Sequence, residues 1–398
     1  TIDHGLQNYA QARLAEESAG SVVIDCETGD LLAMASAPSF DPNLFVRGIS
    51  SKDYSGLRDN IYRPLFNKCV QGTYPPGSTF KMLTGIAALR HGVIGRGETV
   101  YCPGHMTVGG RRFHCWKRGG HGWMNFDKAI TQSCDVYFYE ASQRAGIERM
   151  AETCREFGLG YRNDLPISAV AEGLIPDIKW KARVHDDVWR PGDTVNAAIG
   201  QGYVLTSPLQ LAVMTARIAS GRAIDPRLVK KINGVEQPHS GDAPSLSVDQ
   251  SLMNLVRKAM WNVSNSSRGT ARRSRIVTEG LEMAGKTGTS QVRIITKAER
   301  ARGVIRNDQL PWERRDHGLF VAFAPYDKPK YAIATIVEHG GGGSSAAAPP
   351  SRDILLYALY GDVPPLEAYP KDQRERIRTM NEELVLRPRQ QPPKPTRA

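Results

Sequence analysis

Long hydrophobic runs are absent from this sequence of 398 residues. No apolar stretch approaches the roughly 20 residues that a membrane-spanning helix needs, and the run at 331–337 has the length of a buried strand. A secretory signal peptide is also missing, and the first residue is Thr1 instead of methionine. We therefore expect a fragment of a longer protein, and the absence of an anchor from this sequence says nothing about that longer protein.

A nucleic-acid partner is not expected, because the sequence has neither a recognised binding module nor basic residues alternating with stacking aromatic residues. The formal net charge is nevertheless +11. Basic and acidic residues are interleaved along the chain, which favours an ordinary solvated surface; attraction to an anionic polymer or a membrane surface is the alternative. The composition is that of a globular protein, and the length suffices for about two or three compact domains or one large domain with an insertion.

Strand patterns occur near both ends of the chain, and the middle is mainly helical. A predicted helix over 1–17 precedes a β-hairpin formed by 21–26 and 31–35. The other expected elements are an irregular stretch over 38–60, a helix over 208–219, strands over 283–293, 318–324 and 331–338, and a final helix over 351–360. We infer one sheet assembled from both ends, with a helical insertion beside it. The polar loop 295–316 exceeds ordinary hairpin length, so it is functional or disordered.

A serine and a lysine are spaced for one helix face within the stretch 73–81. Ser78 follows a Pro-Pro-Gly turn, and Lys81 comes three residues later, where an amphipathic run begins. Prolines suit the start of a helix, so we expect a helix from Ser78 to His91 that ends at Gly92. Residues i and i+3 share a helix face, which would bring Lys81 to the Ser78 hydroxyl. A helix start with a capping serine is the alternative, because such a tetrad arises by chance about once in a few hundred residues.

A second polar cluster lies in the first of the late strands. Strand alternation places Thr287 and Thr289 on one face. Gly288 removes a side chain where a ligand would lie against the backbone, and Lys286 supplies a cation for a carboxylate. A polar edge strand with a bulge glycine is the alternative interpretation.

A third cluster, Ser133-Cys134-Asp135, supplies a hydroxyl and a carboxylate two residues apart. If this link is extended, Ser133 and Asp135 face one way and Cys134 faces the other. Alone, the triplet is more typical of a capping turn. All three clusters together carry more information, because penicillin-binding proteins and serine β-lactamases combine Ser-x-x-Lys, Ser-x-Asn and Lys-Thr-Gly in this order.

The sequence therefore resembles the transpeptidase domain of class B penicillin-binding proteins over roughly residues 1–360. Ser133 to Tyr139 and Gly200 to Tyr203 are most similar to the elongation-type branch, the penicillin-binding protein 2 group. Other stretches that carry the resemblance are 2–3, 22–25, 33–36, 40–43, 206–210 and 338–340. One departure is Asp135, because most of the family has asparagine at this position.

This resemblance implies an α/β fold of the α+β type, as in penicillin-binding protein transpeptidases and serine β-lactamases. Its central five-stranded antiparallel sheet would be flanked by helices beside an all-helical subdomain. We expect the transpeptidase domain at 1–361, with a sheet subdomain from about 1–70 and 270–361 and a helical subdomain at about 71–269. Residues 362–398 are rich in Pro, Arg and Gln, and we expect a disordered tail there.

The chemistry that the resemblance implies is acyl transfer through a serine ester. Ser78 would attack the D-Ala-D-Ala carbonyl of a peptidoglycan stem peptide, and an amine from a neighbouring stem would resolve the acyl-enzyme. Lys81 can take the serine proton only when neutral, and burial and a neighbouring cation both lower a lysine pKa. The expected catalytic residues are Ser78, Lys81, Ser133, Asp135 and Lys286, and the expected substrate-binding residues are Thr287, Gly288 and Thr289. Backbone N–H groups of Ser78 and Thr289 would form the oxyanion hole.

Cysteine and histidine residues gather between positions 102 and 134, although six cysteines in so long a chain do not indicate a disulfide scaffold. Three cysteines and one histidine would complete a closed tetrahedral zinc site, and zinc sites in some elongation-type relatives favour this interpretation. The expected ligands are Cys102, Cys115, His121 and Cys134. A Cys102–Cys115 disulfide, unliganded thiols, and His105 or His114 in place of His121 are the alternatives. Cys26, Cys69 and Cys154 are expected to be buried apolar residues.

Two other activities share the acylation site. A D,D-carboxypeptidase passes the acyl group to water, and a β-lactam-sensing domain stops at the acyl-enzyme. A β-lactamase is disfavoured, because no Glu-x-x-Leu-Asn segment lies between the second and third clusters. The resemblance implies a periplasmic domain of an inner-membrane-anchored enzyme of cell elongation and a covalent target of β-lactams. Its implied partners are a SEDS-type, RodA-like glycosyltransferase and the elongation machinery.

Overall fold

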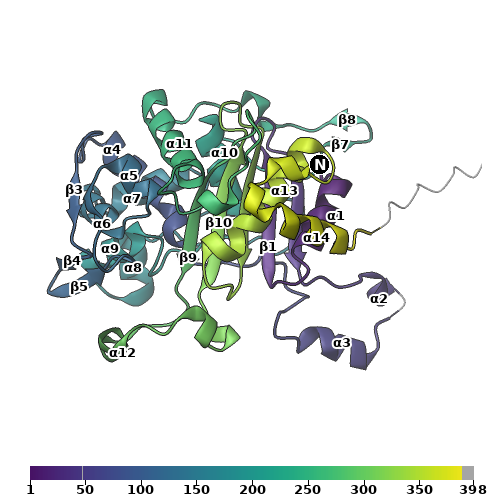
Figure 1. Cartoon of the computed structure of the whole chain (residues 1–398), viewed down its shortest axis with the longest axis horizontal. Coiled ribbons are helices and arrows are strands. Elements are labelled where there is room, and N and C mark those ends of the chain that lie inside the picture. The colour runs from purple at the N-terminus through teal and green to yellow at the C-terminus, as the bar shows by residue number, and fades with distance from the viewer. Residues whose placement is uncertain (47, 388–398) are drawn as a thin grey trace, which may run out of the picture.

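The computed structural model describes residues 1–46 and 48–387, with a five-stranded antiparallel sheet at the centre (Figure 1). In spatial order the strands are β2 (Leu31–Ala37), β1 (Ala19–Asp25), β11 (Tyr331–Val337), β10 (His317–Ala324) and β9 (Ala284–Ser290). The N-terminal hairpin pairs with the last strand, so that Val22 lies opposite Ala334. This topology confirms the predicted α+β fold class and the sheet assembled from both ends of the chain.

Helices cover both faces of the sheet, which explains why its inner strands are continuous apolar runs. Every residue of β10 after His317 is buried, whereas the edge strand β2 alternates buried and half-buried residues. α1 (His4–Arg13) and α13 (Ala348–Tyr360) lie over one face, and α10 (Pro208–Ser220) lies behind the strands (Figure 1). α10 begins with a capping box between Ser207 and Gln210 and ends at Gly221 in the left-handed conformation, as the predicted helix required.

The predicted helical subdomain, 71–269, does not form a unit separate from the sheet. α10 packs on β11 and β1, and α11 (Gln250–Asn265) packs on β9, although both helices come from this range. The rest of the range forms a lobe beside β9 (Figure 1). Its elements are α4 (Lys81–Arg90), β3 (Val100–Cys102), β4 (His105–Val108), β5 (Arg111–His114), β6 (Gly122–Met124), α5 (Phe126–Thr131), α6 (Asp135–Ala145), α7 (Ile147–Glu156), α8 (Ile178–His185) and α9 (Pro191–Ala198). The short hairpin of β7 (Lys231–Ile232) and β8 (Val235–Glu236) lies at the other end of the molecule, on the side of the N-terminus (Figure 1).

α4 is buried along its whole length from Lys81 to Leu89, so the prediction of an amphipathic helix was wrong. It lies between α6 and α7 of the lobe, and α11 also contacts it. A helix that is apolar on every side is a core helix. Lys81, the first residue of α4, is therefore held by packing on all sides.

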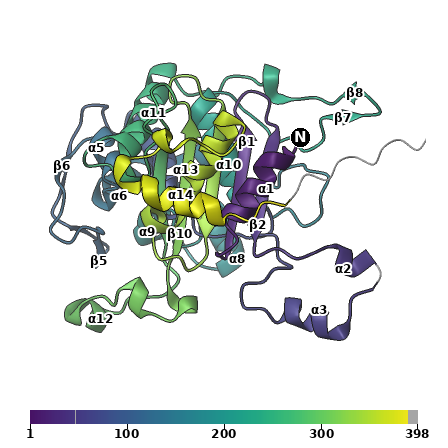
Figure 2. The ribbon, with the colours of Figure 1, turned by 45° about the vertical axis from the view of Figure 1, so that its right-hand side comes forward.

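Three segments outside these layers differ from the prediction. The irregular stretch 38–60 contains α2 (Asn43–Val46) and α3 (Ser51–Arg58), and the loop 295–316 contains α12 (Lys297–Arg302) (Figure 2). The expected disordered tail was wrong for 362–387, because α14 (Arg374–Glu383) forms there and its Ile377 is buried. Positions 388–398 lie outside the described residues. No helix in the described part of the chain is long and apolar enough to cross a membrane.

Candidate active site and metal-binding cluster

Ser78 lies on a 3-10 turn, Gly77–Phe80, that leads into α4. Gly77 has a φ of +55°, and a Cβ atom at this position would overlap the carbonyl oxygen of Thr289. Only glycine allows this turn to lie so close to the end of β9. The Gly77 N–H also donates to the carbonyl of Gly200 at 2.9 Å. The nucleophile turn is thereby held against the strand that carries the Lys-Thr-Gly sequence.

Lys81 is fully buried and donates from Nζ to three acceptors of the Ser133-Cys134-Asp135 cluster. These are the carbonyl of Ser133 at 2.9 Å, its Oγ at 3.1 Å and Oδ1 of Asp135 at 2.7 Å. No hydrogen bond joins Lys81 to Ser78 among the described residues, contrary to our expectation. The carboxylate explains the difference, because a charge-assisted hydrogen bond is about twice as strong as one to a neutral hydroxyl.

Ser133 and Asp135 face Lys81, and the link between them is a helix start, the capping turn named as the more typical case, and not an extended segment. Ser133 has a φ of +55°, which is uncommon for a residue with a Cβ atom, and Asp135 is the first residue of α6. Cys134 lies between them at the helix N-cap. Burial raises the pKa of the Asp135 carboxyl, and the charge of Lys81 offsets only part of this effect.

Lys286 reaches the same hydroxyl from the opposite wall. Its Nζ donates to Ser133 Oγ at 3.0 Å and to the carbonyl of Thr287 at 2.8 Å. Burial, followed by the positive charge of Lys81, holds the pKa of Lys286 well below its ordinary value. Ser133 therefore accepts from both lysines, and its own hydroxyl proton is left for a third partner.

We expected Gly288 to leave space for a ligand, but the structure shows no such space beside it. A Cβ atom here would meet the Pro76 carbonyl and the Thr79 side chain, each at 2.9 Å. The missing side chain lets the nucleophile turn pack against β9. On the other face of the strand, Thr287 is buried and shares a hydrogen bond of 2.8 Å with Thr270, while Thr289 is exposed.

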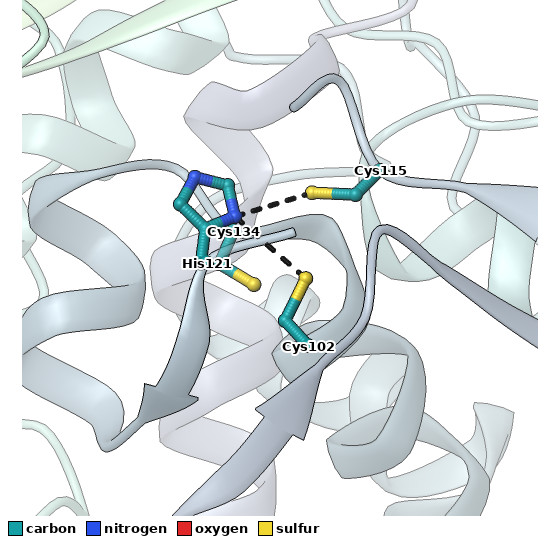
Figure 3. Close-up of side chains that lie close together, drawn as sticks. All are labelled: Cys102, Cys115, His121 and Cys134. Atoms are coloured by element: carbon teal, nitrogen blue, oxygen red, sulfur yellow. Dashed lines mark hydrogen bonds between the residues drawn. The ribbon is translucent and has the colours of Figure 1, made fainter. Parts of the chain in front are cut away.

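The four expected metal ligands come together at the edge of the lobe (Figure 3). Cys102 ends β3, Cys115 follows β5, His121 precedes β6 and Cys134 caps α6. Their ligand atoms all lie within 4.8 Å of one another. His105 and His114 are paired across β4 and β5 and are not part of this group. All six cysteines are free, so the alternative Cys102–Cys115 disulfide is not formed.

The donor geometry of this cluster fits a tetrahedral metal. His121 Nδ1 lies 3.4 Å from Cys115 Sγ and 3.7 Å from Cys102 Sγ. The edges of a tetrahedron with zinc bonds of about 2.0–2.3 Å measure about 3.5–3.8 Å. Hydrogen bonding with Cys134, and further with His121, lowers the pKa of Cys102 and Cys115 to about 4. Thiolates are the form of cysteine that binds metals.

Residues 19–356 match the family model described as "Penicillin binding protein transpeptidase domain". The chain belongs to this family. It is 41% identical over 349 residues to the peptidoglycan D,D-transpeptidase MrdA of Acinetobacter baumannii, covering 85% of this chain and 50% of that protein. The corresponding protein of Haemophilus influenzae is 36% identical over 393 residues, with 96% of this chain and 60% of that protein covered. The chain thus spans about half to three fifths of these curated relatives.

Solved structures agree with this assignment. Pseudomonas aeruginosa PBP2 in complex with WCK 5153 superposes with a TM-score of 0.80 at 38% identity, covering 93% of this chain and 78% of that one. PBP2 of Helicobacter pylori, solved in complex with MreC, also gives a TM-score of 0.80, at 35% identity, with 91% and 63% of the two chains covered. The resemblance to the penicillin-binding protein 2 group is therefore confirmed.

Trp116 is a residue of this transpeptidase domain that our reading of the sequence missed. Its backbone N–H donates to Asp135 Oδ2 at 2.7 Å, and its indole N–H donates to the carbonyl of Ser133 at 3.0 Å. Trp116 directly follows Cys115, so it connects the loop of the Cys/His cluster to the Ser133-Cys134-Asp135 cluster. The only signal for Trp116 in the sequence was its position directly after Cys115, a candidate metal ligand. Gln201, which donates to the Thr289 carbonyl at 3.2 Å, was likewise missed as a site residue.

These contacts explain the departure of Asp135 from the asparagine of most family members. One carboxylate oxygen accepts from Lys81 and the other accepts from Trp116. Asparagine has one acceptor oxygen, and its NH₂ group would face a second donor. We expect Asp135→Asn to lower the rate constant of acylation by penicillin roughly tenfold and to cost about 1–2 kcal/mol of unfolding free energy.

Stopped-flow acylation and urea denaturation measure the two effects of Asp135→Asn. The exposed Asp164→Asn is the matched control and should leave both values unchanged. Unchanged acylation in Asp135→Asn would contradict the requirement for two acceptors.

Proposed function

We propose that this domain is a serine-type peptidoglycan D,D-transpeptidase that cross-links stem peptides during cell elongation. The observation that carries the proposal is the single hydrogen-bonded group formed by Lys81, Ser133 and Lys286 beside the nucleophile turn. The match to the family and the names of the relatives support it. Penicillin-type antibiotics, which mimic D-Ala-D-Ala, would acylate the same serine.

In the first half-reaction, Ser78 Oγ bonds to the carbonyl carbon of the penultimate D-Ala. Its proton passes to Lys81 when the proton shared by the Lys81–Asp135 pair resides on Asp135 and the amine is neutral. The N–H groups of Ser78 and Thr289 bind the oxyanion, a contribution of about 3–4 kcal/mol. The C–N bond then breaks, and terminal D-Ala leaves with a proton relayed by Ser133. Lys286, Thr287 and Thr289 bind the terminal carboxylate. In the second half-reaction, an acceptor amine attacks the ester, and Ser78 regains its proton.

A stem pentapeptide incubated with an amine acceptor separates this activity from its alternatives. A transpeptidase yields the cross-linked dimer, whereas a D,D-carboxypeptidase yields only the shortened peptide. A β-lactam-sensing domain is acylated by penicillin and forms neither product. Liquid chromatography with mass spectrometry distinguishes all three outcomes, and the absence of a dimer would overturn the proposal.

We further propose that Cys102, Cys115, His121 and Cys134 hold one structural zinc ion. Four protein donors would complete the coordination of the metal, so it would have no open position for catalysis. Its role would be to keep the loop that carries Trp116 against Asp135. The acyl transfer itself needs no cofactor.

The proposed location is the periplasm, with the domain joined to an inner-membrane anchor in the full-length protein. The proposed partners are a SEDS-type, RodA-like glycosyltransferase and the elongation machinery. The complex of the Helicobacter pylori relative with MreC supports the second of these. Co-purification of the full-length protein with a RodA-like protein from membranes would test the first.

The buried Lys286 predicts a trade-off between stability and activity. Because its pKa is depressed in the folded state, the unfolded chain binds more protons between that pKa and about 10.5. The free-energy cost of burying the charged form of Lys286 is fully present at pH values below its folded-state pKa. This cost disappears as the pH rises to about 10.5. We expect Lys286→Met to raise the unfolding free energy by roughly 1–2 kcal/mol at pH 7, while acylation is lost. This gain should shrink towards pH 10.

Denaturation at pH 7 and pH 10 tests the Lys286→Met prediction. Lys179, which is exposed, provides the control Lys179→Met, whose effect should not depend on pH. A Lys286→Met protein that is less stable than the parent at pH 7 would show that the two hydrogen bonds of Lys286 outweigh the cost of burying it.

A further inference from the structure

The lobe beside the active site has an uneven charge distribution that the acyl-transfer chemistry does not use. Positions 99–126 contain no aspartate or glutamate, but they contain four lysine or arginine residues. Arg112 lies on β5, and Lys117 and Arg118 follow Trp116 in the metal-binding loop. All three are exposed. A surface with cations and no carboxylate is suited to an anionic ligand.

Arg300, on α12, adds a cation from another part of the fold. Arg112 comes from β5 and Arg118 from the loop between β5 and β6, so the candidate cations belong to three separate segments. Figures 1 and 2 both show α12 and β5 on the same side of the molecule. We call Arg112, Lys117, Arg118 and Arg300 the basic rim.

The cations of the basic rim have no acidic partners within the described residues. None of the four takes part in an ion pair or a side-chain hydrogen bond there. Glu299 is the carboxylate next to Arg300 in the chain, but both of its oxygens accept from Arg293 at 2.6 Å. Elsewhere on the surface, arginines such as Arg144 and Arg155 are paired with carboxylates. The rim thus keeps its full positive charge.

The basic rim is continuous with the active site through Trp116. This side chain is 60% exposed and lies between Cys115 and Lys117, while its two N–H groups bind Asp135 and Ser133. The carboxylate of the leaving D-Ala is assigned above to Lys286 and the threonines of β9. The basic rim lies on the side of the site formed by the Trp116 loop and not at β9. A different anionic group of the substrates would therefore contact it.

We propose that the basic rim binds the carboxylates of the acceptor stem peptide and so directs its amine towards the acyl-enzyme. This inference rests on the proposed function and names a further substrate-binding surface for it. The ligand class is a short acidic peptide, recognised by charge complementarity at an exposed surface. Because the acceptor enters only after acylation, the rim should affect the second half-reaction and not the first.

The test compares Arg112→Gln/Arg118→Gln with the control Lys371→Gln/Arg376→Gln, whose exposed cations lie at α14 on the other side of the sheet. We expect the rim variant to raise the KM for the acceptor roughly five- to tenfold, with the rate of penicillin acylation unchanged. The control should change neither value. Conservative Arg112→Lys/Arg118→Lys should restore most of the acceptor affinity.

Salt dependence provides a second measurement on the unaltered protein. The acceptor KM should rise steeply between low and physiological ionic strength, and much less so in the rim variant. An unchanged acceptor KM in the rim variant would overturn the inference while leaving the proposed function intact. A raised KM for the donor peptide, or binding only to anionic vesicles, would also overturn it. Failure of the unaltered protein to form any dimer would instead count against the proposed function.

Discussion

Replacement of Ser78 by alanine is expected to abolish covalent attachment of penicillin to this protein. Ser78 lies on the turn that Gly77 holds against the end of β9, next to the buried group of Lys81, Ser133 and Lys286. Alanine removes the nucleophilic oxygen and preserves the turn. Intact-mass measurement after incubation with penicillin should show one adduct on the parent protein and none on Ser78→Ala. Loss of a nucleophile of this kind typically costs about 10⁶-fold in rate.

The matched control for this experiment is Ser39→Ala. Ser39 is exposed on the segment after β2, and its hydroxyl makes only a local hydrogen bond to the Phe40 carbonyl. This variant should acquire the same mass adduct as the parent. Labelling that persists in Ser78→Ala would overturn both the assignment of the nucleophile and the order of the proposed reaction.

Removal of the metal is expected to weaken both the stability and the acylation of the domain. The ligands come from the end of β3, the loop between β5 and β6 and the N-cap of α6, so the ion would join these three segments. Loss of a structural metal is among the few single changes that cost more than about 4 kcal/mol. Because Trp116 follows a ligand and contacts Asp135 and Ser133, acylation should slow as well.

Elemental analysis and thermal unfolding test this expectation with Cys102→Ser, which removes one ligand. The parent protein should contain close to one zinc ion per chain, and the variant should contain much less and unfold at a lower temperature. Cys154→Ala is the control, because this buried cysteine lies outside the cluster and its replacement should not change the zinc content. Gently purified parent protein without near-stoichiometric zinc would contradict the metal assignment.

The strands and the nucleophile turn were predictable because their signals are local. Short apolar runs indicated β1, β10 and β11, and the capping residues of α10 marked both of its ends. The cluster of three cysteines and one histidine was also found from residue type and spacing. The disorder expected for 362–387 was wrong because composition does not report burial of Ile377 against the rest of the fold.

The sequence by itself determined the candidate groups of this protein: a serine and a lysine one helical turn apart, a Lys-Thr-Gly strand and a cluster of three cysteines and one histidine. Only the tertiary structure decided how these groups are paired. Lys81 contacts Asp135 instead of Ser78, Gly288 admits the nucleophile turn instead of a ligand, and Trp116 joins the metal-binding loop to Asp135. Each pairing depends on contacts between segments far apart in the chain, which local spacing does not encode.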